Sequence, residues 1–165
     1  MYDQNSADQI GAYLKEHVLT IAVAESVTSG HLQAAMSLGM DASQYFQGGL
    51  TAYNVGQKCR HLNVEPIHAQ KVNSVDETVA RKLAVEVSKL FLSDYGIGIT
   101  GYASIVPECE EEGLHAFFAL SFRYEVVLEK QITSSRPDGF ETQVDFANQV
   151  IAEVSQFLVS KKKRP

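Results

Sequence analysis

The sequence predicts an α/β protein in which helices cover both faces of a mixed sheet, a three-layer α/β/α sandwich. Segments with helical spacing alternate with short apolar segments along most of the 165 residues. The alternation ends in two adjacent strand-like segments, 114–122 and 124–133, which indicate a hairpin about Arg123 and Tyr124. No repeat, low-complexity segment or Pro/Gly/Ser-rich linker interrupts this order, so we expect a single domain over 1–165.

The first part of the chain shows helical and strand patterns in turn. "SADQIGAYLKEHVL" has apolar side chains at helical spacing, with Ser6 or Asp8 as the expected N-cap. "TIAVAE" is short, apolar and partly β-branched, as in a central strand that is covered on both faces. The pair Gly48 and Gly49 indicates a bulge or a close backbone approach in the next strand. The expected elements are a helix over 6–18, a strand over 20–25, a helix over 30–40, a strand over 45–54 and a helix over 55–64.

The second part contains the most regular helical pattern. Ser74 lies three residues before Glu77, which is the spacing of a capping box at a helix N-terminus. "YGIGITG" is a glycine-rich strand, and the closing segment has long helical periodicity. The expected elements are a helix over 72–91, a strand over 95–101, the hairpin strands 114–122 and 124–133, and a helix over 139–159.

Composition and charge exclude several classes of function. The net charge of -6 argues against nonspecific binding to nucleic acid, and no apolar run is long enough for a membrane span. "MYDQNSADQ" lacks the pattern of a secretory signal, so we expect a cytoplasmic protein. Cys59 and Cys109 fit no metal-ligand spacing, so we expect neither a disulfide nor a zinc site. The basic tail over 161–165 is interpreted as solvated.

The stretch "VAESVTSGHL" carries the candidate catalytic serine, Ser26. A buried strand that turns into a helix here exposes backbone N–H groups, and such a helix N-terminus favours negative charge. Ser26 is therefore a candidate nucleophile, with the amides of Val27 to Gly30 positioned for an oxyanion or a phosphate. Local sequence leaves an alternative open: Ser26, Thr28 or Ser29 serves only as the helix cap.

A serine nucleophile needs a base, and Lys58 is the first candidate. The chain has no GxSxG motif, and its five histidines have no spacing that marks a triad partner. A partly buried lysine is neutral more readily and accepts the proton of a serine. Lys58 follows "GGLTAYN", in which Tyr53 ends a strand, so both residues are expected to line a crevice beside Ser26. The alternatives are a solvated lysine and a half-buried strand tyrosine.

Four segments, taken together, resemble the CinA C-terminal family. "VAESVTSGHLQAAM", "YFQGGLTAYNVGQKCRHLNV", "VNSVDETVARKLA" and "GIGITG" have the order and separations of that family's conserved blocks. The resemblance covers about residues 6 to 160. It implies a five-stranded mixed sheet and nicotinamide-mononucleotide amidohydrolase activity, in which a Ser-Lys hydrolase converts a carboxamide to a carboxylate and ammonia. Longer members carry an additional N-terminal domain, so the chain is expected to be a stand-alone form.

The resemblance also implies roles for individual residues. Ser26 would attack, Lys58 would accept its proton, and Tyr53 with Thr100 would orient the pair or the carboxamide. Arg136 would hold the phosphate as a bidentate donor. The expected partner is a small nucleotide, without cofactor or metal, and a homo-oligomer is left open. The expected substrate-binding residues are Thr28, Ser29, Gly30, Gly48, Gly49, Thr100, Gly101 and Arg136.

One segment departs from the family pattern. Where the family has a glycine-rich loop after T-G, this chain reads "YASIVPECEEEG", and acidic side chains near a phosphate would be repulsive. If these acids point to solvent, the departure has no effect. The alternative to the amidohydrolase is therefore an inactive or re-specified paralogue that binds a nucleotide or a protein partner.

Overall fold

The computed structural model describes residues 1–105, 113–137 and 139–162. The four glutamates of the departing loop and Cys109, all within 106–112, lie outside the described residues, as do residues 163–165 of the basic tail. Lys161 and Lys162 belong to the last helix, so the helix extends into the segment that was interpreted as a solvated tail.

A five-stranded sheet forms the centre of the fold, with the strand order β2-β1-β3-β4-β5. The strands β2, β1 and β3 are parallel, and β4 and β5 add to this sheet as an antiparallel hairpin. The prediction of a mixed sheet ending in a hairpin is confirmed. The strands are β1 (Ile21–Glu25), β2 (Phe46–Thr51), β3 (Tyr95–Gly101), β4 (His115–Phe122) and β5 (Glu125–Thr133).

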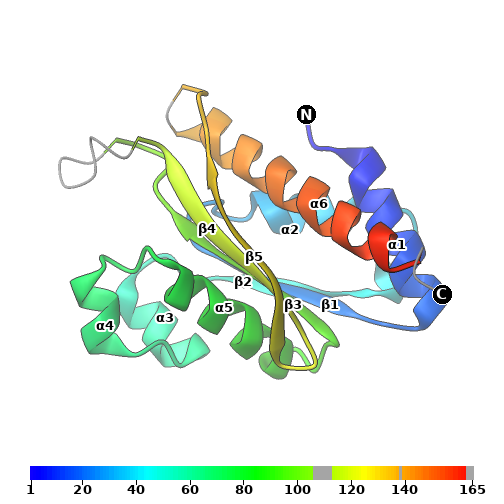
Figure 1. The fold of residues 1–165 in the computed structure, drawn as a ribbon, viewed down its shortest axis with the longest axis horizontal. Coiled ribbons are helices and arrows are strands. Elements are labelled where there is room, and N and C mark those ends of the chain that lie inside the picture. Colours follow the sequence, from blue (N-terminus) through cyan, green and yellow to red (C-terminus); the bar gives the residue numbers. More distant parts are fainter. Residues whose placement is uncertain (106–112, 138, 163–165) are drawn as a thin grey trace.

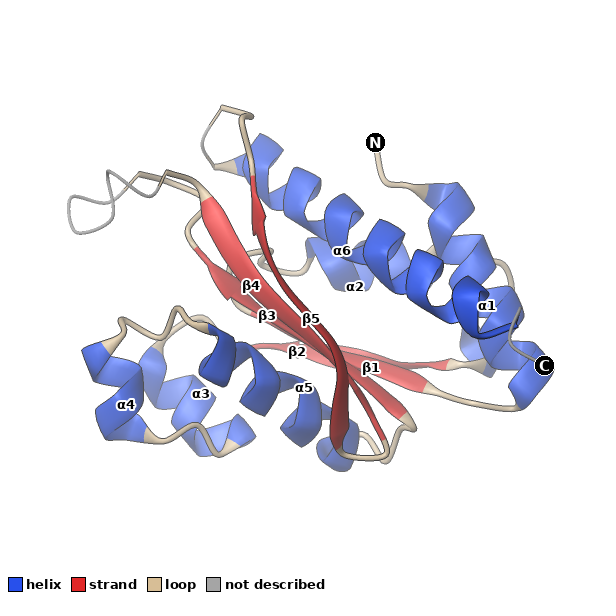
Figure 2. Ribbon diagram, viewed as in Figure 1, coloured by secondary structure: helices blue, strands red, loops and turns tan. Residues whose placement is uncertain are grey.

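Helices cover both faces of the sheet, as Figures 1 and 2 show. The helices α1, α2 and α6 pack against one another on one face, whereas α3, α4 and α5 lie on the other. The three-layer α/β/α arrangement is therefore confirmed. The helices are α1 (Gln4–His17), α2 (His31–Ser37), α3 (Val55–Leu62), α4 (Pro66–Lys71), α5 (Glu77–Leu90) and α6 (Phe140–Lys162), with a 3-10 turn at Ala42–Gln44.

The starts of the helices differ from the expectations. The N-cap of α1 is Asp3, not Ser6 or Asp8, and its side chain accepts from the Ser6 amide. Asp76, not Ser74, caps α5, because Ser74 has a left-handed backbone with φ of 60°. The helix α4 was missed, although a glutamate followed by proline is a recognisable start signal.

The glycine pair in β2 has the structural role that the sequence indicated. The register between β1 and β2 shifts between Ile21 and Ala22, and Gly48 on the partner strand has φ of +113°. A Cβ atom on Gly49 would lie 2.6 Å from Val23 Cγ2. The bulge and the close approach are both confirmed.

Close packing of α5 on β3 requires glycine in the strand. A Cβ atom on Gly98 would lie 2.4 Å from the backbone nitrogen of Ala84, and one on Gly96 would lie 2.1 Å from the Ala84 carbonyl oxygen. The hydroxyl of Ser121 on β4 donates to the same carbonyl at 2.9 Å. The helix is therefore held directly against the sheet backbone.

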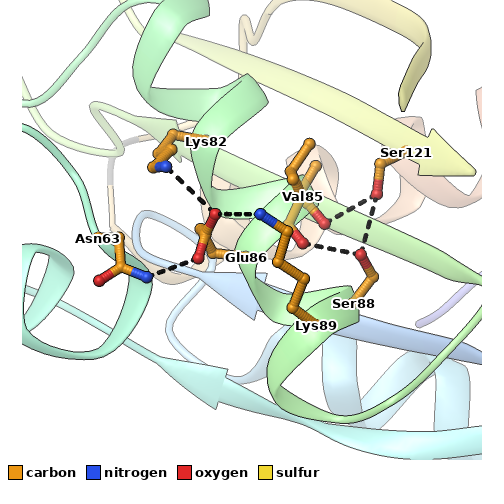
Figure 3. Close-up of polar contacts among 8 residues, drawn as sticks. Asn63, Lys82, Val85, Glu86, Ser88, Lys89 and Ser121 are labelled. Carbon is orange, nitrogen blue, oxygen red and sulfur yellow. Dashed lines mark hydrogen bonds and ion pairs between the residues drawn. The ribbon is translucent and has the colours of Figure 1, made fainter. Parts of the chain in front are cut away.

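Glu86 joins α5 to α3 (Figure 3). Its carboxylate accepts hydrogen bonds from Asn63, which follows the last residue of α3, and from Lys82 and Lys89 on α5. Burial by itself raises the pKa of Glu86, but the hydrogen bonds from Lys89, Asn63 and Lys82 outweigh it and lower the pKa to about 2. The contact fixes the end of the helix that carries Lys58.

We expect Gly98→Ala to lower the free energy of unfolding by about 2 to 3 kcal/mol, because the new methyl group forces α5 away from the sheet. Gly56→Ala is the matched control, since Gly56 lies in α3 and a Cβ there meets only Asn54 Oδ1 at 3.4 Å. That change should leave stability equal or slightly higher. Urea unfolding of both variants measures the difference, and equal stabilities would contradict the packing account.

Candidate active site

A pocket of about 240 Å³ lies where β1 and β3 end. Ser26 follows β1, Thr100 and Gly101 end β3, and Tyr53 and Lys58 come from the segment after β2. The carboxyl edge of parallel strands is the usual place for a ligand in an α/β sheet. The structure thus brings Ser26, Lys58, Tyr53, Thr100 and Gly101 together in one pocket.

The turn that carries Ser26 is built around Glu25, whose side chain is fully buried. One carboxylate oxygen accepts from the Thr28 hydroxyl at 2.5 Å, the Gly30 amide at 3.1 Å and the Leu32 amide at 2.9 Å. The other oxygen accepts from the Gln33 amide at 2.8 Å. Because these donors belong to the turn and the first residues of α2, the carboxylate fixes both relative to β1.

This arrangement corrects the expected anion site at the start of α2. The Gly30 amide is already bonded to Glu25, and the Ser29 amide donates to the Ser26 carbonyl at 3.2 Å. An internal carboxylate therefore occupies the helix N-terminus, where an external anion would otherwise be favoured. The amides of Val27 and Thr28 have no acceptor among the described residues, and of these two residues Val27 lines the pocket whereas Thr28 is fully buried outside it.

Lys58 is buried, with only 3% of its surface exposed, so the alternative of a solvated lysine is wrong. Its Nζ donates to the backbone carbonyl of Tyr53 at 3.1 Å. Burial disfavours the charged ammonium and lowers the pKa of Lys58 from 10.5 to about 8. A substantial fraction of the side chain is therefore the neutral amine at mildly alkaline pH.

Tyr53 contributes to the site mainly through its backbone. It lies in the loop after β2, and its residue surface is 69% exposed, so it is not a half-buried strand tyrosine. Its carbonyl oxygen accepts a hydrogen bond from the Lys58 Nζ, and the residue is part of the pocket lining.

The end of β3 forms the floor of the pocket. Thr100 is buried, and its hydroxyl donates to the Ser74 carbonyl oxygen at 2.7 Å. The hydroxyl proton is therefore engaged, and only the oxygen lone pairs face other partners. A Cβ atom on Gly101 would lie 2.4 Å from the His115 carbonyl oxygen, so this glycine permits the close pairing of β3 with β4.

Several expected substrate-binding residues lie outside the pocket. Thr28, Ser29 and Gly30 shape the turn, while Gly48 and Gly49 shape β2. Arg136 lines a different hollow, together with Glu141 and Asp145 of α6. Their expected contact with a substrate stays a prediction.

Four polar residues of the pocket were missed by the sequence analysis: Asn73, Tyr102, Ser104 and Gln143. Asn73 and Tyr102 line one wall, and the Asn73 amide donates to the Tyr102 hydroxyl at 2.9 Å. Gln143 reaches the pocket from α6, on the opposite face of the sheet from α5. Asn73 has a left-handed φ of 49°, for which asparagine is favoured, but no signal in the sequence marks Gln143.

The described residues contain no cluster of three or more His, Cys, Asp or Glu side chains arranged to hold a metal ion. Within 1–105, 113–137 and 139–162, every helix is too short or too polar to cross a bilayer.

Solved structures with the same fold include two from enterobacteria. A competence or damage-inducible protein from Enterobacter asburiae superposes with a TM-score of 0.85 at 22% identity, covering 96% of this chain and 99% of that one. The competence damage-inducible protein A (ComA) from Klebsiella pneumoniae gives a TM-score of 0.86 at 22% identity, covering 96% and 98%. At this identity the likeness supports the fold.

Sequence comparison gives the family. A CinA-like protein from Picosynechococcus sp. is 43% identical over 94 residues, which is 57% of this chain and 22% of that protein. A putative competence-damage inducible protein from Moorella thermoacetica is 33% identical over 135 residues, 81% of this chain and 32% of that protein. The chain thus spans a third or less of these relatives. The model of the CinA C-terminal domain matches residues 3–155, and the chain therefore belongs to the CinA C-terminal domain family.

Proposed function

We propose that the chain is an amidohydrolase that converts nicotinamide mononucleotide to nicotinate mononucleotide and ammonia through Ser26 and Lys58. The observation that carries the proposal is a serine at a fixed turn that shares one pocket with a buried lysine of lowered pKa. Strongly perturbed ionisable groups in clefts are typical of catalytic sites. The family resemblance supplies the substrate.

The residues supply each step of an acyl transfer. The neutral amine of Lys58 accepts the Ser26 proton as the serine oxygen attacks the carboxamide carbon. The N–H group of Val27 donates to the oxyanion that forms. The Lys58 ammonium then gives its proton to the departing nitrogen, which leaves as ammonia. Water, deprotonated by the same lysine, hydrolyses the ester on Ser26 and releases the carboxylate.

A second candidate is a relative that takes an uncharged carboxamide. Lys58 is the only cationic side chain among the described residues that line the pocket, and its Nζ is bonded to Tyr53. A phosphate normally needs further donors or cations. Nicotinamide riboside, which has no phosphate, separates this candidate from the first.

Ser26→Ala and Lys58→Ala are each expected to reduce ammonia release from nicotinamide mononucleotide by at least about 1000-fold. Each change removes either the nucleophile or the base, and neither group acts without the other. The double variant should be hardly slower than either single variant. Initial rates from purified protein, with nicotinamide riboside and nicotinamide as parallel substrates, measure the effect. Thermal unfolding of the variants controls for loss of fold.

Two results would contradict this account. Undiminished ammonia release by Ser26→Ala would exclude the serine as nucleophile. Release from nicotinamide riboside but not from the mononucleotide would replace the proposed substrate with the uncharged one.

The pH dependence follows from the lowered pKa of Lys58. Since the neutral amine is the active form, kcat/KM should rise tenfold per pH unit below about 8 and level off above it. A profile that is flat between pH 6 and 9, or one that falls as the pH rises, would argue against lysine as the base.

Lys58→Met tests the cost of burying this amine. At pH 7 the buried ammonium destabilises the folded state, because the unfolded chain keeps the ordinary pKa of 10.5. The inactive Lys58→Met protein should be about 1 to 2 kcal/mol more stable at pH 7, and this gain should shrink between pH 8 and 10.5. Chemical unfolding at several pH values measures it. A variant less stable than the wild type at pH 7 would contradict the burial argument.

A further inference from the structure

Gln143 is held rigidly in the pocket wall by the start of α6. The Gly139 amide donates to the Ala103 carbonyl at 2.6 Å, which ties the helix start to the segment after β3. The fully buried Thr142 donates from its hydroxyl to the Pro137 carbonyl at 2.8 Å. The Gln143 backbone amide donates to Gly139 at 3.0 Å, so its place in the first turn is fixed.

The side chain of Gln143 is half-buried, and its amide makes no hydrogen bond with any described residue. Gln149, also half-buried on α6, donates to the Thr133 carbonyl at 3.0 Å and to Asp145 at 2.8 Å. Because Gln143 lines the pocket and its amide is not used in the same way, this amide is available to a molecule that enters the pocket.

Among the other polar groups of the pocket, the hydroxyls of the exposed residues Tyr53 and Ser104 make no hydrogen bond with a described residue, and most of the rest have partners. Asn73 and Tyr102 bond each other on one wall, and the hydroxyl of Thr100 donates to Ser74. Under the proposed function, Val27 and Lys58 act on the reacting carboxamide. Gln143, a half-buried side chain fixed on a helix, is therefore placed to bind the rest of the substrate molecule.

The chemistry of this amide selects a neutral partner. A glutamine side chain offers one acceptor and two donors without charge. A group that both donates and accepts, such as a sugar hydroxyl, uses both functions, whereas a phosphate accepts only. Resting on the proposed function, we infer that Gln143 is a specificity-determining residue that hydrogen-bonds a ribose hydroxyl of the amide substrate.

Gln143→Met tests this inference, because methionine has a similar length but no amide. The KM for nicotinamide mononucleotide and for nicotinamide riboside should rise about tenfold at unchanged kcat. The lost hydrogen bond stabilises the bound substrate and the transition state equally, so only binding is weakened. Kinetics with nicotinamide, which has no ribose, should not change. Gln156→Met is the control, because Gln156 is exposed on the same helix and lines a separate hollow. It should behave as the wild type with all three compounds.

Binding measurements separate this inference from the catalytic proposal. Titration calorimetry with nicotinamide riboside compares Ser26→Ala with Ser26→Ala/Gln143→Met, and affinity should fall about tenfold in the double variant. This result would support the role of Gln143 even if the wild type released no ammonia, which would refute only the proposed function. Equal affinities, absence of binding to Ser26→Ala, or an equal change in KM for nicotinamide would overturn the inference.

Discussion

The buried carboxylate of Glu25 is the constraint on which the candidate site depends. Burial of a charge is unfavourable unless hydrogen bonds compensate for it, and here one hydroxyl and three amides do so. All four donors belong to residues 28–33, which therefore have one arrangement relative to β1. Ser26 lies between the carboxylate and its donors, so its position at the strand end follows. The same contacts close the start of α2 to external anions.

The second half of the site depends on burying a lysine without an acidic partner. Glu86 holds the end of α3, and the Tyr53 carbonyl receives the Lys58 Nζ, so the side chain is kept away from water. No salt bridge to Lys58 is present within the described residues, and burial therefore lowers its pKa. An ion pair would stabilise the ammonium and remove the neutral base. The site is built at the expense of some stability, as is common for catalytic groups.

The sequence predicted most of the fold because its apolar periodicities are strong. The alternation of elements, the hairpin at Arg123 and Tyr124 and the bulge at Gly48 all follow from local patterns. Ser26 and Lys58 were found because each follows a strand that ends at the same edge. Glu25 was missed, since every residue of β1 is buried and no alternation marks an inward carboxylate. Arg136 and Gln143 depend on how the start of α6 meets the sheet, which no local pattern encodes.

Amide hydrogen exchange in Glu25→Gln tests most directly whether this carboxylate holds the turn beside Ser26. The amides of Gly30, Leu32 and Gln33 should be protected in the wild type. In the variant, the amides on one side of the former carboxylate, either Gly30 and Leu32 or Gln33, should exchange at least about tenfold faster, because glutamine keeps one accepting oxygen and its NH2 group accepts no hydrogen bond. The Ile97 amide, in the central strand β3, serves as the internal reference. Unchanged protection of the three amides, relative to Ile97, would contradict the account.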